Sequence, residues 1–259
     1  MGIINITPDS FYDGGKTFSE KEIVKQAEKM LSEDATFLDV GGYSSRPGAD
    51  KIPVHEETKR VVTAINTILK HFPNALISVD TFRSEVAQNA VNAGACMVND
   101  ISGGSLDPEM YQSVSKLKVP YVLMHMRGTP KTMAKLTNYQ NVSLAVIKDL
   151  SEKIALARAA GINDLIADPG FGFAKTPAQS FELLNNLELF KSLEIPFLAG
   201  ISRKSMIYKT LETSAENALN GTTALNTVAL LKGASILRVH DVKEARECII
   251  LHNHLKSGY

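Results

Sequence analysis

The sequence predicts an α/β protein that forms a single (β/α)8 barrel, with a functional site at the rim where the strands end. Eight short apolar runs recur along the 259 residues, and most are continuous rather than alternating. Continuous runs are typical of parallel strands that are covered on both faces. Helical patterns lie between the runs, and the length fits one barrel of this class.

The expected strands lie at intervals along the whole chain. They are residues 2–7, 36–42, 76–81, 96–102, 121–126, 164–170, 197–202 and 236–241. An open doubly wound sheet is the competing architecture, and it usually has a glycine-rich first turn. No GxGxxG motif follows the first strand, which favours the barrel.

Apolar residues with helical spacing fill the intervals between the strands. The sets are Ile23, Ala27, Met30 and Leu31; Val61, Ile65, Ile68 and Leu69; Val86, Ala90 and Val91; Ile147, Leu150 and Ile154; and Leu225, Ala229 and Leu230. Ser19 with Glu22 has the pattern of a capping box, while Asp107-Pro108 and Thr176-Pro177 pair an N-cap with a first-turn proline. No linker or composition shift marks a boundary, so we expect one domain, residues 1–259.

The bulk composition excludes several classes of function. Lysine plus arginine and aspartate plus glutamate both total 28, so the net charge favours neither nucleic acid nor an anionic membrane as partner. Two distant cysteines, Cys96 and Cys248, indicate no disulfide framework, and we expect a cytoplasmic protein. The sequence contains no CxxC or HExxH metal motif, no signal peptide and no membrane-spanning run.

Polar residues gather where the expected strands end. They are Asn5, Asp39, Asp80, Asn99, Asp100, His125, Asp168, Ser202, Arg203, Lys204, Arg238 and His240. Folding does not require such residues, and barrel enzymes place their catalytic groups at this rim. Helix capping or turn closure is the alternative interpretation for Asp39, Asp100 and Asp241, but it does not explain the whole set. His55, His71, His252 and His254 are interpreted as structural, and His125 is given no role.

Motifs at these strand ends point to one family. They are the opening segment 1–15, Gly41 to Ala49 (GGYSSRPGA), Ser78-Val79-Asp80-Thr81, Asn99 to Gly104 (NDISGG), Leu123-Met124-His125-Met126, Asp168 to Phe173 (DPGFGF), Ser202-Arg203-Lys204-Ser205 and Arg238-Val239-His240-Asp241. In this order, across nearly the whole chain, they resemble the dihydropteroate synthase family. That resemblance implies a transferase of folate biosynthesis that joins p-aminobenzoate to a dihydropterin diphosphate and releases pyrophosphate.

The resemblance implies which residues bind the pterin. Asp168 would accept the ring N–H and the amino group side by side, as a carboxylate accepts arginine. Asn99 would serve the neighbouring ring positions, and Lys204 would donate to the carbonyl side. Asp80 is expected close to the ring, and Met124 is carried over as a substrate contact. Helix capping or a salt bridge is the alternative role for the two aspartates.

The resemblance also implies a diphosphate site with magnesium. Arg238 and His240, after the eighth strand, would hold the diphosphate. Asn5, on the first strand, would bind Mg²⁺ together with substrate phosphates, and Asp13 would assist. Arg238, His240 and Mg²⁺ would stabilise the departing negative charge, while Asp80 and Asp168 would stabilise the cation left on the pterin. The arylamine is neutral at pH 7 and needs no strong base.

Two walls are implied for p-aminobenzoate. Ser45, Arg46 and Pro47 would form one wall and Phe173 the other, while Ser205 would donate to the carboxylate. A helix starting at Ser205 would also favour an anion. The resemblance further implies a homodimer and inhibition by sulfonamides competitive with p-aminobenzoate.

Three positions depart from the family pattern. Tyr43 replaces a common acidic residue, Ser45 replaces a threonine but keeps the hydroxyl, and Asp34 stands at a common helix-ending glycine. Two other functions are alternatives to dihydropteroate synthesis. A methyltetrahydrofolate-binding methyltransferase barrel would have no use for a diphosphate site, which argues against it. A non-catalytic pterin-binding protein would keep the pocket without turnover.

Overall fold

The computed structural model describes residues 1–6, 20–44 and 51–257, and its eight strands match the predicted ones. They are β1 (Gly2–Asn5), β2 (Phe37–Gly41), β3 (Leu76–Asp80), β4 (Met97–Asp100), β5 (Tyr121–Met124), β6 (Leu165–Asp168), β7 (Leu198–Ala199) and β8 (Ile236–Leu237). Each is shorter than predicted. The prediction extended the strands into the polar segments that follow them, where the ladder of hydrogen bonds has ended.

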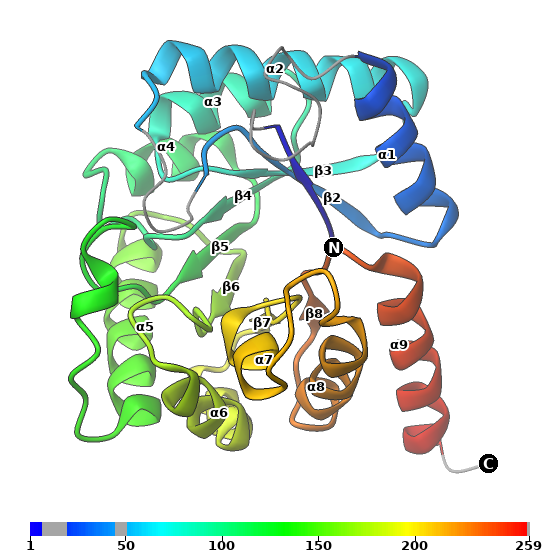
Figure 1. Cartoon of the computed structure of the whole chain (residues 1–259). Coiled ribbons are helices and arrows are strands. Elements are labelled where there is room, and N and C mark those ends of the chain that lie inside the picture. The colour runs from blue at the N-terminus through cyan, green and yellow to red at the C-terminus, as the bar shows by residue number, and fades with distance from the viewer. Residues whose placement is uncertain (7–19, 45–50, 258–259) are drawn as a thin grey trace.

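The strands close into the predicted (β/α)8 barrel (Figure 1). Strands β1 to β6 form one parallel sheet in chain order, and β7 pairs with β8. Single bridges join the two sheets on both sides, Ala167 with Phe197 and Gly2 with Val239. At the second bridge Ile3 N donates to Val239 O at 2.9 Å. The first and eighth strands therefore lie side by side, as the prediction of the diphosphate site requires.

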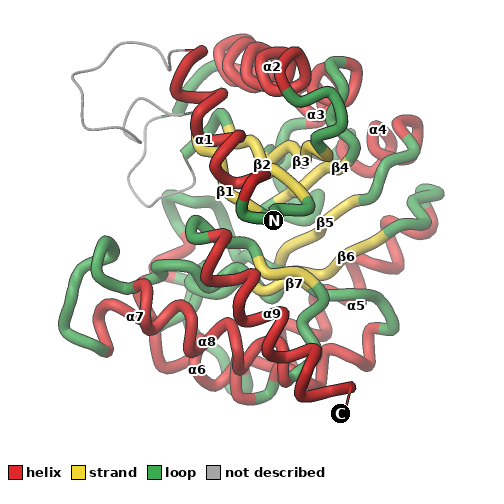
Figure 2. Tube along the Cα trace, turned by 90° about the vertical axis from the view of Figure 1, so that its right-hand side faces the viewer, coloured by secondary structure: helices red, strands yellow, loops and turns green. Residues whose placement is uncertain are grey.

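Helices surround the barrel, as Figures 1 and 2 show. They are α1 (Glu20–Ser32), α2 (Val54–His71), α3 (Ser84–Asn92), α4 (Met110–Leu117), α5 (Val142–Ala159), α6 (Pro177–Asn185), α7 (Ser205–Thr210), α8 (Leu219–Leu231) and α9 (Val242–Ser257), with the 3-10 turns η2 (Met133–Lys135) and η3 (Leu187–Leu193). Their apolar faces pack on the outer faces of the strands. Within the described ranges, no helix is long and apolar enough to cross a membrane.

Local capping signals are confirmed in part. Thr176 and Gln179 form a full capping box at α6. The predicted start of α4 at Pro108 is wrong, because this helix begins at Met110. The Asp107 carboxylate instead accepts the N–H of Ser84 at 2.7 Å, at the start of α3, and that of Glu109 at 3.0 Å. Ser19 of the other predicted capping box lies outside the described residues.

The alternation of side chains along the strands positions the site. Successive side chains of a strand point to opposite faces. One set faces the helices, and the other fills the barrel. Inside, an apolar layer crosses the barrel where the strands begin, formed by Met97, Val122, Ile166 and Leu198 with Met1, Phe37 and Ile236. Two residues further along the chain from Phe37, Met97, Ile166 and Ile236, the inward positions are polar: they are Asp39, Asn99, Asp168 and Arg238.

Candidate active site

The polar layer above this apolar layer brings together most of the predicted site. By the same alternation Asp39, Asp80, Asn99, Met124, Asp168 and Arg238 take inward positions at the carboxyl ends of six different strands. Asp39, Asn99 and Asp168 are buried, and Asp80 and Arg238 are partly exposed. The fold therefore gathers three carboxylates, an amide and a guanidinium at the mouth of the barrel.

Arg238 lies between two of the carboxylates. Its Nε donates to Asp39 Oδ2 at 2.6 Å, and its Nη2 donates to Asp80 Oδ2 at 2.5 Å. Asn99 Nδ2 also donates to Asp39 Oδ2, at 2.9 Å. The interpretation of Asp39 as a cap or turn residue is therefore wrong, since Asp39 holds two of the predicted site residues. The alternation along β2 is the signal that would have found it.

Burial gives this cluster unusual proton affinities. It raises the pKa of Asp80 to about 7, although Arg238 acts in the opposite direction and Asp39 adds to the rise. Burial alone would lower the pKa of Arg238, but the carboxylates of Asp39 and Asp80 raise it above its usual value. Arg238 is thus a permanent cation, while Asp80 gains or loses its proton near neutral pH.

Asp168 and Lys204 form the second charged group of the site. A Cβ placed on Gly200 would lie 3.8 Å from Lys204 Nζ and 3.9 Å from Asp168 Oδ2, so both groups flank this glycine. Asp168 Oδ1 accepts the N–H of Gly170 at 2.7 Å. Burial raises the pKa of Asp168, against the opposing effect of Lys204. Burial lowers the pKa of Lys204 to about 8, and Asp168 opposes that change.

The predicted aromatic wall adjoins Lys204. Lys204 Nζ donates to Phe171 O at 2.6 Å and lies 4.9 Å from the centre of the Phe173 ring. Lys204 is also the N-cap residue of α7, so Ser205 opens this short helix. The four residues thus lie together where the loops after β6 and β7 meet.

His240 lies exposed at the rim, next to Ser202. Ser202 Oγ lies 3.0 Å from His240 Nδ1 and accepts the His240 backbone N–H at 3.2 Å. Arg203, from the same motif, has a structural role. It binds Asp241 through Nε at 2.9 Å and Nη2 at 2.8 Å, and it donates to Ala215 O at 3.0 Å.

Other predictions have mixed outcomes. Asp100 closes a turn, as its alternative interpretation holds, because it accepts from Ser102 N at 2.7 Å, Gly104 N at 2.8 Å and the Tyr121 hydroxyl at 2.6 Å. Tyr43, in place of the acid, packs edge-on against Phe82 with 5.1 Å between ring centres. Asp13, Ser45, Arg46 and Pro47 lie outside the described residues, so their roles stay predictions.

The end of β1 offers oxygen to a metal ion. A Cβ on Gly41 would lie 3.7 Å from Asn5 Oδ1 and 3.4 Å from Asp80 Cβ, so the Asn5 amide faces the acidic cluster. Amide and carboxylate oxygens suit Mg²⁺, which often keeps several waters and completes its shell with substrate phosphates. Within the described part of the chain, no group of three His, Cys, Asp or Glu side chains could hold a metal.

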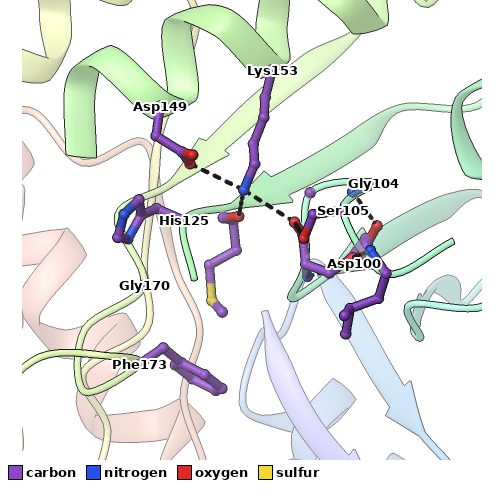
Figure 3. A network of polar contacts seen from close by, with 12 residues as sticks. Asp100, Gly104, Ser105, His125, Asp149, Lys153, Gly170 and Phe173 are labelled. Carbon is purple, nitrogen blue, oxygen red and sulfur yellow. Dashed lines mark hydrogen bonds and ion pairs between the residues drawn. The ribbon is translucent and has the colours of Figure 1, made fainter. Parts of the chain in front are cut away.

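Three buried residues with contacts at this rim were not predicted as site residues. Lys175 contacts His125, and Lys153 donates to Ser102 O at 3.1 Å and Met124 O at 3.2 Å. Figure 3 shows Lys153 reaching down from α5, beside Asp149, with His125, Gly170 and Phe173 nearby. The sequence carries no signal for these contacts, because each of them joins residues that lie far apart along the chain.

The fold and the site define a (β/α)8-barrel enzyme with a cluster of charged side chains at the carboxyl ends of its strands. Comparison with known proteins specifies the family. The model of the family described as pterin binding enzyme matches residues 1–240. The chain belongs to the pterin-binding enzyme family.

Relatives within the family are synthases of one kind. Over 251 residues the chain is 42% identical to the dihydropteroate synthase of Escherichia coli K12, covering 96% of this chain and 88% of the relative. It is 42% identical to the folic acid synthesis protein fol1 of Schizosaccharomyces pombe over 99% of this chain, but it spans only 36% of that longer relative.

Solved structures agree with these relatives. The Yersinia pestis dihydropteroate synthase with a sulfonamide drug complex has a TM-score of 0.94 and 37% identity, with 99% of this chain and 94% of that chain covered. The Xanthomonas albilineans enzyme in complex with 7,8-dihydropteroate has a TM-score of 0.89 and 36% identity, with 100% and 93% covered. The predicted resemblance to dihydropteroate synthases, enzymes of folate synthesis, is confirmed.

Proposed function

We propose that this site condenses 6-hydroxymethyl-7,8-dihydropterin diphosphate with p-aminobenzoate to give 7,8-dihydropteroate and pyrophosphate. The observation that carries the proposal is the polar layer inside the barrel mouth, in which carboxylates, an amide and two cations face one space. Relatives with the same fold bind 4-aminobenzoate and 7,8-dihydropteroate, as their structures are described. The arrangement suits a flat polar ring with an anionic tail.

The pterin ring would lie between Asp168, Lys204 and Asn99. Asp168 keeps Oδ2 on the side of Gly200 while Oδ1 accepts from Gly170, so the carboxylate is held in one orientation. Lys204 Nζ also lies beside Gly200 and would donate to the carbonyl side of the ring.

The leaving diphosphate would lie at β1 and β8. Arg238 uses Nε and Nη2 for its two carboxylates, and Nη1 is the nitrogen that neither carboxylate engages. His240 lies two residues along the same segment and is fixed by Ser202. Asn5, with Asp13, would hold Mg²⁺, which would supply positive charge to the diphosphate when bound.

The residues around the reacting carbon would act by charge and position. Loss of pyrophosphate leaves positive charge on the pterin methylene, and the ionised carboxylates of Asp80 and Asp168 would stabilise it. The neutral arylamine then forms the new C–N bond and releases one N–H proton to solvent, with Phe173 against its ring. No covalent intermediate is required, because the arylamine itself is the nucleophile.

Replacing His240 with alanine is expected to weaken binding of the pterin diphosphate about tenfold, since one charge-assisted hydrogen bond contributes roughly 1.5 kcal/mol. Binding of the pterin that lacks the diphosphate should change little, because His240 lies at the β8 rim. Calorimetry with both ligands measures the difference. Equal losses for the two ligands would show that His240 shapes the pocket instead of holding phosphate.

Inhibition by sulfonamides tests the proposed function through its second substrate. A sulfonamide carries the same arylamine on a flat ring, so it should compete with p-aminobenzoate for the slot between Phe173 and the predicted wall at residues 45–47. A steady-state series at several p-aminobenzoate concentrations should show the apparent inhibition constant rising with p-aminobenzoate. An inhibition constant that is independent of p-aminobenzoate would contradict this assignment.

The remaining assignments follow the family. We place the activity in one domain that assembles as a homodimer in the cytoplasm. The methyltransferase alternative has no use for the Arg238 and His240 pair. A non-catalytic pterin-binding protein would bind the pterin but release no pyrophosphate, which separates it from the proposed enzyme.

A further inference from the structure

A buried lysine lies beneath the loop that follows β6. Lys175 is only 7% exposed, yet its Nζ has three polar neighbours within hydrogen-bond distance. They are His125 Nδ1 at 2.8 Å, Gly170 O at 2.9 Å and Phe173 O at 3.0 Å. An ammonium group has three N–H donors, so the number of neighbours equals the number of donors.

The loop from Pro169 to Thr176 folds tightly around this nitrogen. Gly170, Gly172 and Ala174 have positive φ angles of 68°, 77° and 49°. Such angles are unfavourable for alanine, so the surrounding contacts must hold Ala174 in this conformation. A side chain on Gly170 would come within 2.1 Å of His125 O, which shows how closely the loop approaches the end of β5.

The opposite side of the same loop holds the proposed pterin site. Gly170 N donates to Asp168 Oδ1 at 2.7 Å, and Phe171 O accepts from Lys204 Nζ at 2.6 Å. The Phe173 ring lies 4.9 Å from Lys204 Nζ. Two charged groups of the site, Asp168 and Lys204, thus contact backbone atoms and a side chain of one short loop.

We propose that Lys175 is a positioning residue of the pterin site, which acts with His125 by fixing the carbonyls of Gly170 and Phe173. The proposal rests on the proposed function, because the loop matters only if Asp168 and Lys204 bind a pterin. Lys175 does not touch the substrate. It sets the loop that orients the residues that do.

The contacts are retained in two protonation states. Burial lowers the pKa of His125 to about 2, so the ring is neutral and Nδ1 accepts from a charged Lys175. Burial also lowers the pKa of Lys175 well below its usual value. A neutral amine would donate to the two carbonyls and accept from His125 Nδ1–H. The role of Lys175 therefore depends on its position and hydrogen bonds and is independent of its charge.

The test compares kinetic constants of Lys175→Met with those of the wild type. Methionine keeps a similar length and apolar stem but has no donor. The loop orients Asp168 and Lys204, which would hold the pterin ring in the ground state as well as in the transition state, so the loss is mainly one of uniform binding. We expect the KM for the pterin diphosphate to rise at least tenfold, with kcat changed less than about threefold. Lys175→Gln keeps two N–H donors and should give an intermediate KM.

Lys153→Met is the matched control. Lys153 is 8% exposed and also donates to two carbonyls, but these belong to Ser102 and Met124 and lie outside the loop after β6. Its KM for the pterin diphosphate should rise much less than that of Lys175→Met. An equal rise in both variants, or a fall in kcat at unchanged KM, overturns the proposal.

Calorimetry with the pterin that lacks the diphosphate separates this proposal from the proposed function. If the wild type binds this pterin and Lys175→Met binds it at least tenfold more weakly, both proposals are supported. If the wild type and Lys175→Met bind this pterin equally well, only the role of Lys175 is overturned. A wild-type chain that does not bind the pterin overturns the proposed function and this proposal with it.

Discussion

Replacing Arg238 with alanine should lower kcat/KM by roughly 10²–10³-fold and also destabilise the fold. The catalytic loss follows from removal of the cation proposed to hold the diphosphate. The fold suffers because the variant leaves Asp39 and Asp80 without their shared partner. Asp39 is fully buried, and breaking a buried ion pair by removing one partner typically costs about 3–5 kcal/mol.

The pH dependence of that destabilisation tests its cause. The pKa of Asp80 is already raised to about 7 in the folded wild type, above its value in the unfolded chain, and loss of Arg238 would raise it further. A carboxyl with a raised folded pKa stabilises the fold at low pH, and this contribution is lost as pH rises through that pKa. The variant should therefore be destabilised more at pH 8 than at pH 5.

Urea unfolding at both pH values and steady-state kinetics measure these effects. Arg238→Lys is the matched control, since it keeps a positive charge but cannot engage both carboxylates and a phosphate with fixed geometry. It should recover much of the stability and little of the activity. An alanine variant with wild-type stability would show that the two carboxylates do not depend on Arg238.

Replacing Asp168 with asparagine should weaken pterin binding by about 10–100-fold or more. An amide cannot accept the two side-by-side donors of the pterin, and each buried mismatch costs about 1–3 kcal/mol, with more when a charge is lost. The substitution also removes the carboxylate beside Lys204. The remaining amide oxygen can still accept from Gly170 N, so the loop after β6 should keep its conformation.

Calorimetry with the dihydropterin diphosphate measures the loss. Asp241→Asn serves as the control, because Asp241 is an acid near the rim whose carboxylate pairs with Arg203. The affinity of Asp241→Asn for the dihydropterin diphosphate should equal that of the wild type. Unchanged affinity in Asp168→Asn would remove Asp168 from the pterin site.

Much of the fold was predictable because parallel strands that are buried on both faces leave a strong signal. The runs at β2 to β6 are continuous and apolar, and each prediction was wrong only at its ends. β7 and β8 have just two paired residues each, yet their neighbours continue the apolar run. The start of α4 was misjudged because Asp107 caps α3 and not its own helix, a contact across the fold that local spacing does not reveal.

The site was predictable where a motif ends a strand. Asp80, Asn99, Asp168, Lys204 and Arg238 come together as expected, although whether they bind substrate stays a prediction. Asp39 was recognised as a strand-end residue but not as a site residue, because a single acid at a strand end is also typical of a helix cap or a turn. Lys153 and His125 were missed because their partners lie far away along the chain. Lys175 was missed because it binds carbonyls of its own loop, and local spacing does not reveal how that loop folds.

The condensing activity is tested by measuring pyrophosphate release from the pterin diphosphate. The assay is run in the presence of Mg²⁺, with and without p-aminobenzoate. The wild type should release pyrophosphate in amounts equal to the dihydropteroate formed, and Asp168→Asn should release far less. Absence of pyrophosphate release with both substrates present, or release without formation of dihydropteroate, would contradict the assignment of this barrel as the condensing enzyme.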